Sequence, residues 1–165
     1  MSKAVVIYNS KGGNTKRVAE KIAEGLEADI YDNKNIPDLS GYDLVAVGSW
    51  MMMGMISFPG SKYLKKLRKK GIEGKKVAMF YTGGGPEEVH WKTEKTDNPK
   101  KLHTIMFEKM EAILTKKTNV TILKERYYCK GAIRMRGEVT ANEGCPTDED
   151  LERAKEFGIQ LKSLL

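Results

Sequence analysis

The sequence has few of the residues that cross-link small secreted proteins or bind metal ions. Its two cysteines, Cys129 and Cys145, are too few for a disulfide framework and form no C-x-x-C motif. Its two histidines, His90 and His103, stand apart, without metal-ligand spacing to a cysteine or an aspartate. We therefore expect free thiols, a cytoplasmic protein and no bound metal.

Long hydrophobic runs are also missing. No apolar run approaches the ~20 residues that a membrane-spanning helix requires, so we expect no membrane span. The N-terminal sequence MSKAVVIY leads directly into a predicted strand, without the apolar segment and cleavage site of a signal peptide. Single domains commonly have about 100–200 residues. The chain of 165 residues therefore predicts one domain over residues 1–165.

Negative charge is in deficit, because 29 Lys and Arg stand against 22 Asp and Glu, which gives a net charge of +7. The basic residues cluster at 62–76 and at 92–101. Such clusters are typical of a solvated helix face and a basic loop. The alternative is a docking face for an acidic partner protein, or nonspecific affinity for polyanions. No nucleic-acid motif accompanies the charge, so we expect no nucleic-acid binding.

What the sequence does contain is a regular alternation of strand and helix patterns. The predicted strands are Ala4–Tyr8, Ala28–Tyr31, Leu44–Trp50, Val77–Tyr81 and Val120–Leu123, the last resumed at Arg126–Cys129; the predicted helices are Thr15–Leu26, Pro59–Lys70, Pro99–Lys117 and a last one capped by Thr147. Strands without polar alternation, separated by helices, indicate a parallel sheet covered on both faces. We predict a doubly wound, three-layer α/β sandwich with five parallel strands. Ligands of such sheets bind at the carboxyl ends of the strands, which here are the loops after Tyr8, Trp50 and Tyr81.

The first of these loops has the composition of a phosphate cradle. Gly12 and Gly13 allow close approach of the backbone, and Ser10, Asn14 and Thr15 add short polar side chains at a helix start. The loop is neither a Walker loop nor a G-x-G-x-x-G motif, and it suits a phosphate monoester better than a triphosphate. The alternative is an ordinary strand-to-helix turn.

The second loop, GSWMMMGMIS at 48–57, holds four of the nine methionines of the chain. Thioethers make favourable contacts with aromatic rings, so this loop is a candidate to lie against a flat ligand. The alternative is that these methionines fill the core or cover a protein interface.

The third loop, YTGGGPEEVHW at 81–91, places three consecutive glycines directly after a strand. Their backbone N–H and C=O groups could bond the rim of a heterocycle, and Trp91 could stack on its ring. The alternative is a flexible connector. Taken together, the three loops predict a site for a phosphorylated, flat ring system with a polar rim.

These loops resemble those of the flavodoxin family. The stretch VIYNSKGGNT at 6–15, with Ala19 beyond it, resembles the FMN-phosphate signature, while GSWMMMG and FYTGGG are similar to the second and third flavin loops. YYCKG and CPTDEDLERAKEFGIQL resemble the fifth strand and the last helix. The resemblance spans nearly the whole chain. It implies a sheet with the strand order 2-1-3-4-5 and noncovalent FMN.

The resemblance also implies which residues meet the cofactor. Ser10, Asn14 and Thr15, with the backbone of Lys11, Gly12 and Gly13, would hold the phosphate; Ser49, Trp50, Met51, Met52 and Gly54 would line the flavin; Thr82, Gly83, Gly84 and Gly85 would meet its edge. Trp50 replaces a frequent proline and Met52 a frequent aromatic residue, so ring stacking would depend on Trp50 or Trp91.

The function that the resemblance implies is electron transfer between redox partner proteins. The alternative is an FMN-dependent NAD(P)H:quinone-type oxidoreductase, and a third interpretation is a flavin-free domain used for protein contact. Flavodoxins are typically acidic, whereas this chain is basic, so an acidic partner is expected. No catalytic residue is predicted: Cys129 is expected to be a small buried residue at a strand end rather than a nucleophile.

Overall fold

The computed structural model describes residues 2–165 and has a parallel sheet at its centre. The strands of this sheet lie in the order β2-β1-β3-β5-β6, and the short β4 pairs antiparallel with β3. Their bounds are β1 Ala4–Tyr8, β2 Asp29–Asp32, β3 Leu44–Met52, β4 Met55–Ile56, β5 Lys76–Gly83 and β6 Thr121–Lys130. With β4 set aside, this is the order 2-1-3-4-5, so the predicted fold is confirmed.

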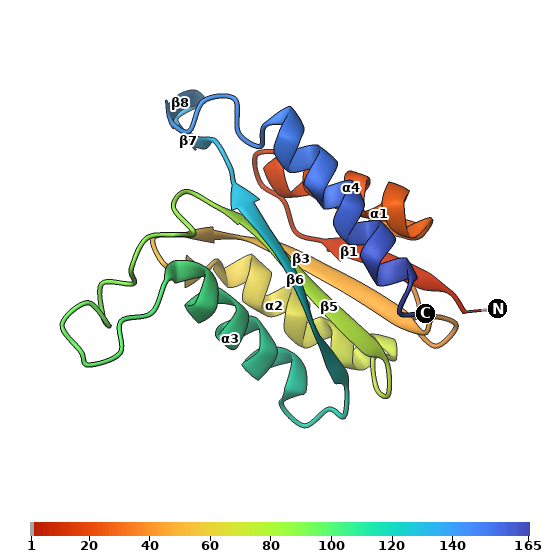
Figure 1. The fold of residues 1–165 in the computed structure, drawn as a ribbon. Helices are drawn as coiled ribbons and strands as arrows, with labels where there is room; N and C mark the ends of the chain where they lie inside the picture. The colour runs from red at the N-terminus through yellow and green to blue at the C-terminus, as the bar shows by residue number, and fades with distance from the viewer. Residues whose placement is uncertain (1) are drawn as a thin grey trace.

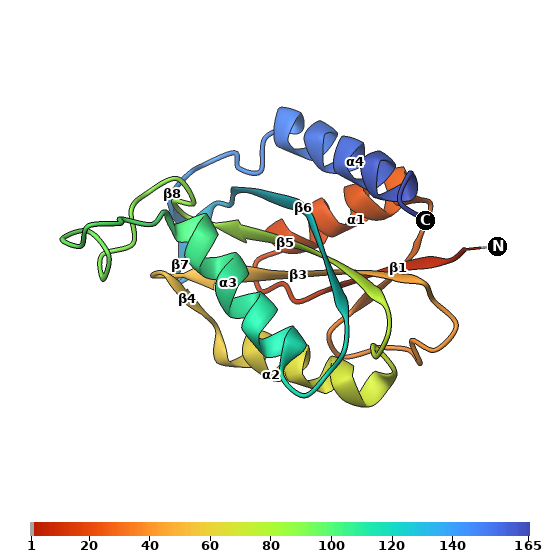
Figure 2. The same ribbon diagram turned by 60° about the horizontal axis from the view of Figure 1, so that its bottom comes forward.

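Helices cover both faces of the sheet (Figures 1 and 2). Helices α1 (Asn14–Leu26) and α4 (Asp148–Lys162) pack on one face, and α2 (Phe58–Leu67) and α3 (Leu102–Thr115) on the other. Along β1, Val6 packs in the core under α1 and α4, whereas Val5 and Ile7 pack in the core under α2 and α3. Burial on both faces is why the central strands β1, β3 and β5 lack polar alternation. None of the helices within residues 2–165 is long and apolar enough to cross a membrane.

Helices α1 and α4 touch through two glycines. A Cβ on Gly158 would lie 2.2 Å from the carbonyl oxygen of Ile22, and one on Gly25 would lie 2.0 Å from the carbonyl oxygen of Lys155. Both separations are too short for non-bonded atoms, so only glycine permits this backbone contact. The contact holds the last helix directly against the first.

The structure corrects the bounds of two predicted helices. The helix predicted at Pro99–Lys117 is wrong at both ends, because α3 begins at Leu102 and ends at Thr115. Lys101 forms a β-bridge with Val89, and the carbonyl oxygen of Lys100 accepts a hydrogen bond from the amide of His90 at 2.8 Å, so the chain before Leu102 is extended. The helix predicted at Pro59–Lys70 ends at Leu67 and continues as one 3-10 turn.

Two hairpins were not predicted from the sequence. The second loop is mostly the β3–β4 hairpin, whose turn residues Met53 and Gly54 have φ of 51° and 74°. Strands β7 (Ile133–Met135) and β8 (Glu138–Ala141) form a separate hairpin with turn residues Arg136 and Gly137 at φ of 54° and 82°. Turns with two positive φ values favour Asn-Gly or Asp-Gly, and these two carry neither signal.

The hydroxyl of Tyr81 provides a test of the core under α2 and α3. It is the one buried side-chain polar atom without a hydrogen-bond partner among the described residues, whereas the Tyr63 hydroxyl donates to the carbonyl of Gly48. We expect Tyr81→Phe to raise the free energy of unfolding by about 1 kcal/mol, because an unsatisfied buried hydroxyl is removed. Tyr63→Phe serves as the matched control. It should lower the free energy of unfolding by about 1 kcal/mol, because it removes a hydrogen bond that is formed.

Urea unfolding measures both free energies, and the melting temperatures should move by about 2–4 °C in opposite directions. A loss of stability in Tyr81→Phe comparable to that in Tyr63→Phe would show that the Tyr81 hydroxyl is bonded in solution.

Candidate functional site

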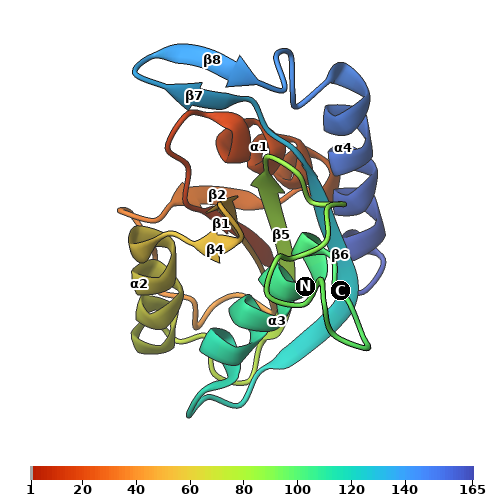
Figure 3. The same cartoon turned by 90° about the vertical axis from the view of Figure 1, so that its left-hand side faces the viewer.

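The three loops singled out in the sequence meet at one edge of the sheet, where the parallel strands end (Figure 3). The amide of Asn9, in the first loop, donates to the carbonyl of Gly48 at 3.0 Å. The hydroxyls of Thr15 and Thr82 lie 2.8 Å apart and tie the start of α1 to the third loop. Trp50 and Thr82 are neighbours in the β3–β5 register. The structure therefore places all three predicted groups of site residues side by side.

The first loop presents unbonded backbone donors at the start of α1. Within residues 2–165, no hydrogen bond uses the amides of Lys11, Gly12, Asn14, Thr15 or Lys16. The loop is shaped by Gly13, which has φ of 90° and donates its amide to the Ser10 hydroxyl at 3.1 Å.

The start of α1 also lacks compensating negative charge. No side chain caps this helix and its first turn holds no acidic residue. By contrast, the first turn of α4 holds three acidic residues, and Thr147 and Asp150 form a capping box. A helix start with free amides and uncompensated partial positive charge favours an anion.

Two of the predicted phosphate ligands also bond to other parts of the protein. Thr15 is buried and its hydroxyl is shared with Thr82, while the side-chain amide of Asn14 donates to the carbonyl of Ala132 at 3.0 Å. Each of these groups retains a further hydrogen: the hydroxyl pair has two and uses one, and the Asn14 amide has two and uses one. Their contact with a ligand stays a prediction.

The second loop presents its methionines to solvent. Met51 is buried, but Met52 is 50% exposed and Met53 80% exposed, so the hairpin tip is apolar and uncovered. Trp50 is half-buried, and the ammonium of Lys11 lies 5.9 Å from the centre of its ring. This cation–π contact joins the first loop to the second.

Residues of the third loop and of α3 pack against the turn of the second loop. A Cβ on Gly54 would lie 3.2 Å from the ring of His90, which is itself buried. The ammonium of Lys109 donates to the carbonyl of Gly54 at 3.3 Å. Trp91, 61% exposed, stacks on His90 with ring centres 5.4 Å apart. The predicted stacking residue is thus accessible, and it packs on the histidine that lies against Gly54.

The β7–β8 hairpin, which was not predicted from the sequence, also lies at this edge of the sheet. The side chain of Ile133 lies against Gly84, where a Cβ would be 2.7 Å away, and Cδ of Arg134 is 3.9 Å from a Cβ placed on Gly12. After the hairpin, the Asn142 side-chain amide donates to the carbonyl of Gly84 at 2.6 Å. The hairpin therefore lies over both the first and the third loop, and a side chain at 84 would require the Ile133 side chain to shift.

A family model described as Flavodoxin domain matches residues 5–158. The chain belongs to the flavodoxin family. An uncharacterized protein of Methanocaldococcus jannaschii is 31% identical over 170 residues, which are 99% of this chain and 98% of that protein. A flavodoxin of Aquifex aeolicus is 32% identical over 96 residues, 52% of each chain. The solved structure of a flavodoxin from the domain Archaea has a TM-score of 0.64 at 26% identity, covering 98% of this chain and 97% of that one.

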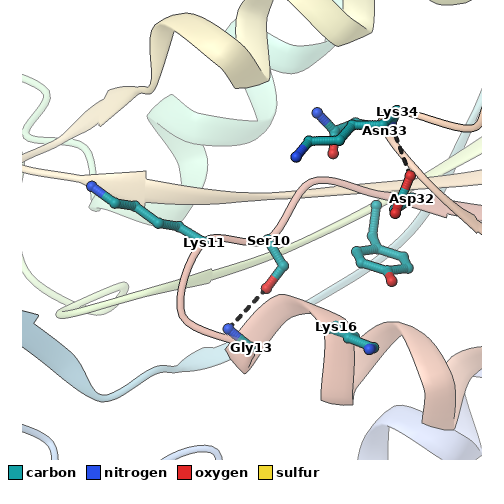
Figure 4. Close-up of a pocket in the computed structure, with 8 residues that line it drawn as sticks. Ser10, Lys11, Gly13, Lys16, Asp32, Asn33 and Lys34 are labelled. Carbon is teal, nitrogen blue, oxygen red and sulfur yellow. Dashed lines mark hydrogen bonds between the residues drawn. The ribbon is translucent and has the colours of Figure 1, made fainter. Parts of the chain in front are cut away.

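The edge of the sheet where the three loops meet has a basic border. Figure 4 shows Ser10 and Gly13 of the first loop on the side of Asp32 and Lys34 at the end of β2, while the side chain of Lys11 extends away from them. The carboxylate of Asp32 accepts hydrogen bonds from the backbone amides of Lys34 at 2.9 Å and Asn35 at 3.0 Å. Three lysines, Lys11, Lys16 and Lys34, line the hollow between these segments against one carboxylate, so positive charge is in excess here.

Other reactive side chains do not gather at the site. Burial of Cys129 raises the pKa of its thiol to about 12, so it is a thiol at neutral pH, as expected for a small buried residue. Both cysteines are free. Among the described residues, no three His, Cys, Asp or Glu side chains are grouped to hold a metal ion.

The donor set fits a flavin phosphate. Free amides surround the start of α1, the Ser10 hydroxyl adds a side-chain donor, and Arg134 lies beside Gly12. The exposed methionines offer a soft apolar surface to a flat ring.

Proposed function

We propose that this flavodoxin-family chain binds FMN noncovalently and carries electrons between redox proteins in the cytoplasm. The observation that carries the proposal is the set of unbonded amides at the uncapped start of α1, beside an exposed apolar loop. A phosphate ester at a helix start and a flat ring against the methionines account for both features together. Membership of the flavodoxin family supports the same cofactor.

In this proposal, one group of residues would bind the phosphate of FMN and another group would contact its flavin ring. Ser10 and the backbone of 11–15 would hold the phosphate, with the Thr15 hydroxyl anchored to Thr82. Residues 49–52 with Gly54, and residues 82–85, would border the flavin ring, and Trp91 would be available to cover it. Bound FMN supplies the redox chemistry, while the protein binds and orients it.

Carrier and reductase differ in how the flavin receives electrons. The test loads the protein with FMN, removes free flavin and mixes it anaerobically with NADH or NADPH while the flavin absorbance is followed. A carrier should keep its colour with either nucleotide and lose it when a separate reductase is added. Fast bleaching by NADH or NADPH alone, followed by turnover with a quinone, would contradict the carrier function in favour of an NAD(P)H:quinone-type oxidoreductase.

Arg134 is a candidate phosphate contact that can be tested separately. It forms no ion pair within residues 2–165, and its side chain crosses Gly12. A hydrogen bond between charged groups contributes about 1.5–3 kcal/mol. We therefore expect Arg134→Gln to raise the dissociation constant of FMN about ten-fold or more, since ten-fold corresponds to about 1.4 kcal/mol.

Arg136→Gln is the matched control, because Arg136 occupies the turn of the same hairpin and the substitution removes the same charge. Quenching of flavin fluorescence measures both constants. Equal constants in the two variants would show that Arg134 acts only through net charge.

A further inference from the structure

Two adjoining hollows form a basic groove beside the flavin loops. One, of about 320 Å³, lies between the first loop and the end of β2, and the other, of about 350 Å³, lies between the end of β2 and α2. They share Asn33 and Lys34 in their walls. The lysines that line them are Lys11, Lys16, Lys34, Lys62 and Lys66, and we call these five residues the basic groove.

No carboxylate within residues 2–165 pairs with a lysine of the basic groove. Elsewhere on the surface lysines are neutralised, as in Lys100–Glu108 at 2.9 Å and Lys101–Glu87 at 2.8 Å. Asp32 is the one acidic residue that lines the hollows, and it is bonded to backbone amides. Residues 57–72 hold six basic residues and no acidic one. Unpaired charges of one sign in a hollow produce a positive potential that attracts anionic surfaces.

An exposed apolar patch borders the basic groove. It consists of Met53, Met55 and Phe58, with exposed fractions of 80%, 54% and 81%. The patch runs from the β3–β4 hairpin to the first turn of α2, and Lys62 and Lys66 follow on that helix (Figure 3). Protein interfaces commonly combine an apolar centre with a polar rim, and methionine side chains adapt to different partners.

We propose that the basic groove and the patch of Met53, Met55 and Phe58 form the docking face for an acidic electron-transfer protein. The inference rests on the proposed function, because the groove adjoins the FMN loops: Lys11 belongs to the first loop and its ammonium lies over the ring of Trp50. A partner seated here would lie against the flavin loops. The apolar patch favours a protein over a nucleic acid, since a phosphate backbone would use the lysines alone.

The test uses a charge-reversed double variant and two haem proteins as probes. Lys62→Glu with Lys66→Glu changes the groove, while Lys116→Glu with Lys124→Glu makes the same charge change at exposed, unpaired lysines at the opposite end of the sheet. The FMN-loaded protein is reduced and mixed with acidic cytochrome b5 or basic cytochrome c in a stopped-flow instrument. The haem absorbance reports the second-order rate constant of electron transfer.

We expect the groove variant to transfer electrons to cytochrome b5 about ten-fold more slowly than the wild type at low salt. The control variant should change that rate less than about two-fold, and the wild-type rate should fall as sodium chloride rises from about 25 to about 250 mM. With cytochrome c, the groove variant should be faster than the wild type. Equal cytochrome b5 rates in the two variants, or a wild-type rate that rises with salt, would overturn the proposal.

A second measurement separates this proposal from that of FMN binding. Calorimetric titration of the protein as purified with cytochrome b5 needs no flavin, and we expect the dissociation constant to rise about ten-fold in the groove variant only. The proposal is wrong if the groove variant binds cytochrome b5 as tightly as the wild type does but binds a labelled single-stranded DNA 20-mer more weakly. The face would then be a nucleic-acid surface. A protein that binds cytochrome b5 through the groove but does not retain added FMN would overturn the cofactor alone.

Discussion

The parallel pairing of β1, β3 and β5 is the constraint on which the site depends. Because these strands run in one direction, their carboxyl ends reach the same edge, and each loop that leaves them starts beside the others. The contact between the Thr15 and Thr82 hydroxyls exists because α1 begins where β1 ends, two strands from β5. A shift in this register would move the first loop relative to the third.

Close backbone packing fixes the direction in which the first helix starts. Helix α4 lies against α1 through Gly25 and Gly158, and Gly48 leaves room for the ring of Phe80 on the same side of the sheet. Glycine is needed at these positions because a Cβ atom would overlap with the neighbouring backbone or ring, not because the chain must be flexible there. The unbonded amides of the first loop are therefore held by the core, although the loop itself contains few buried side chains.

The parts of the fold that follow local rules could be predicted from the sequence. Strand β1 has the predicted bounds because a short apolar run ends at Asn9. The last helix begins after Thr147 because Thr147 and Asp150, three residues apart, form a capping box. The alignment of the three loops followed from the strand pattern alone.

The remaining features depend on contacts between distant residues. The start of α3 is set by the bridge of Val89 with Lys101, and the hairpin over the first loop is held by Asn14 and Asn142, far apart in the chain. No local signal marks these pairs. A glycine after a charged residue, as in Arg136-Gly137, was the one sequence sign of that hairpin, and it is weak because the favoured pairs are Asn-Gly and Asp-Gly.

Binding of a flavin phosphate by the first loop underlies the proposed function. A side-by-side fluorescence titration of the protein with FMN and with riboflavin tests it most directly, because the two ligands differ only in that phosphate. Several charge-assisted bonds of about 1.5–3 kcal/mol each would make FMN bind at least about 100-fold more tightly. Equal affinities would contradict the phosphate cradle, and absence of binding to either ligand would contradict the flavin site itself.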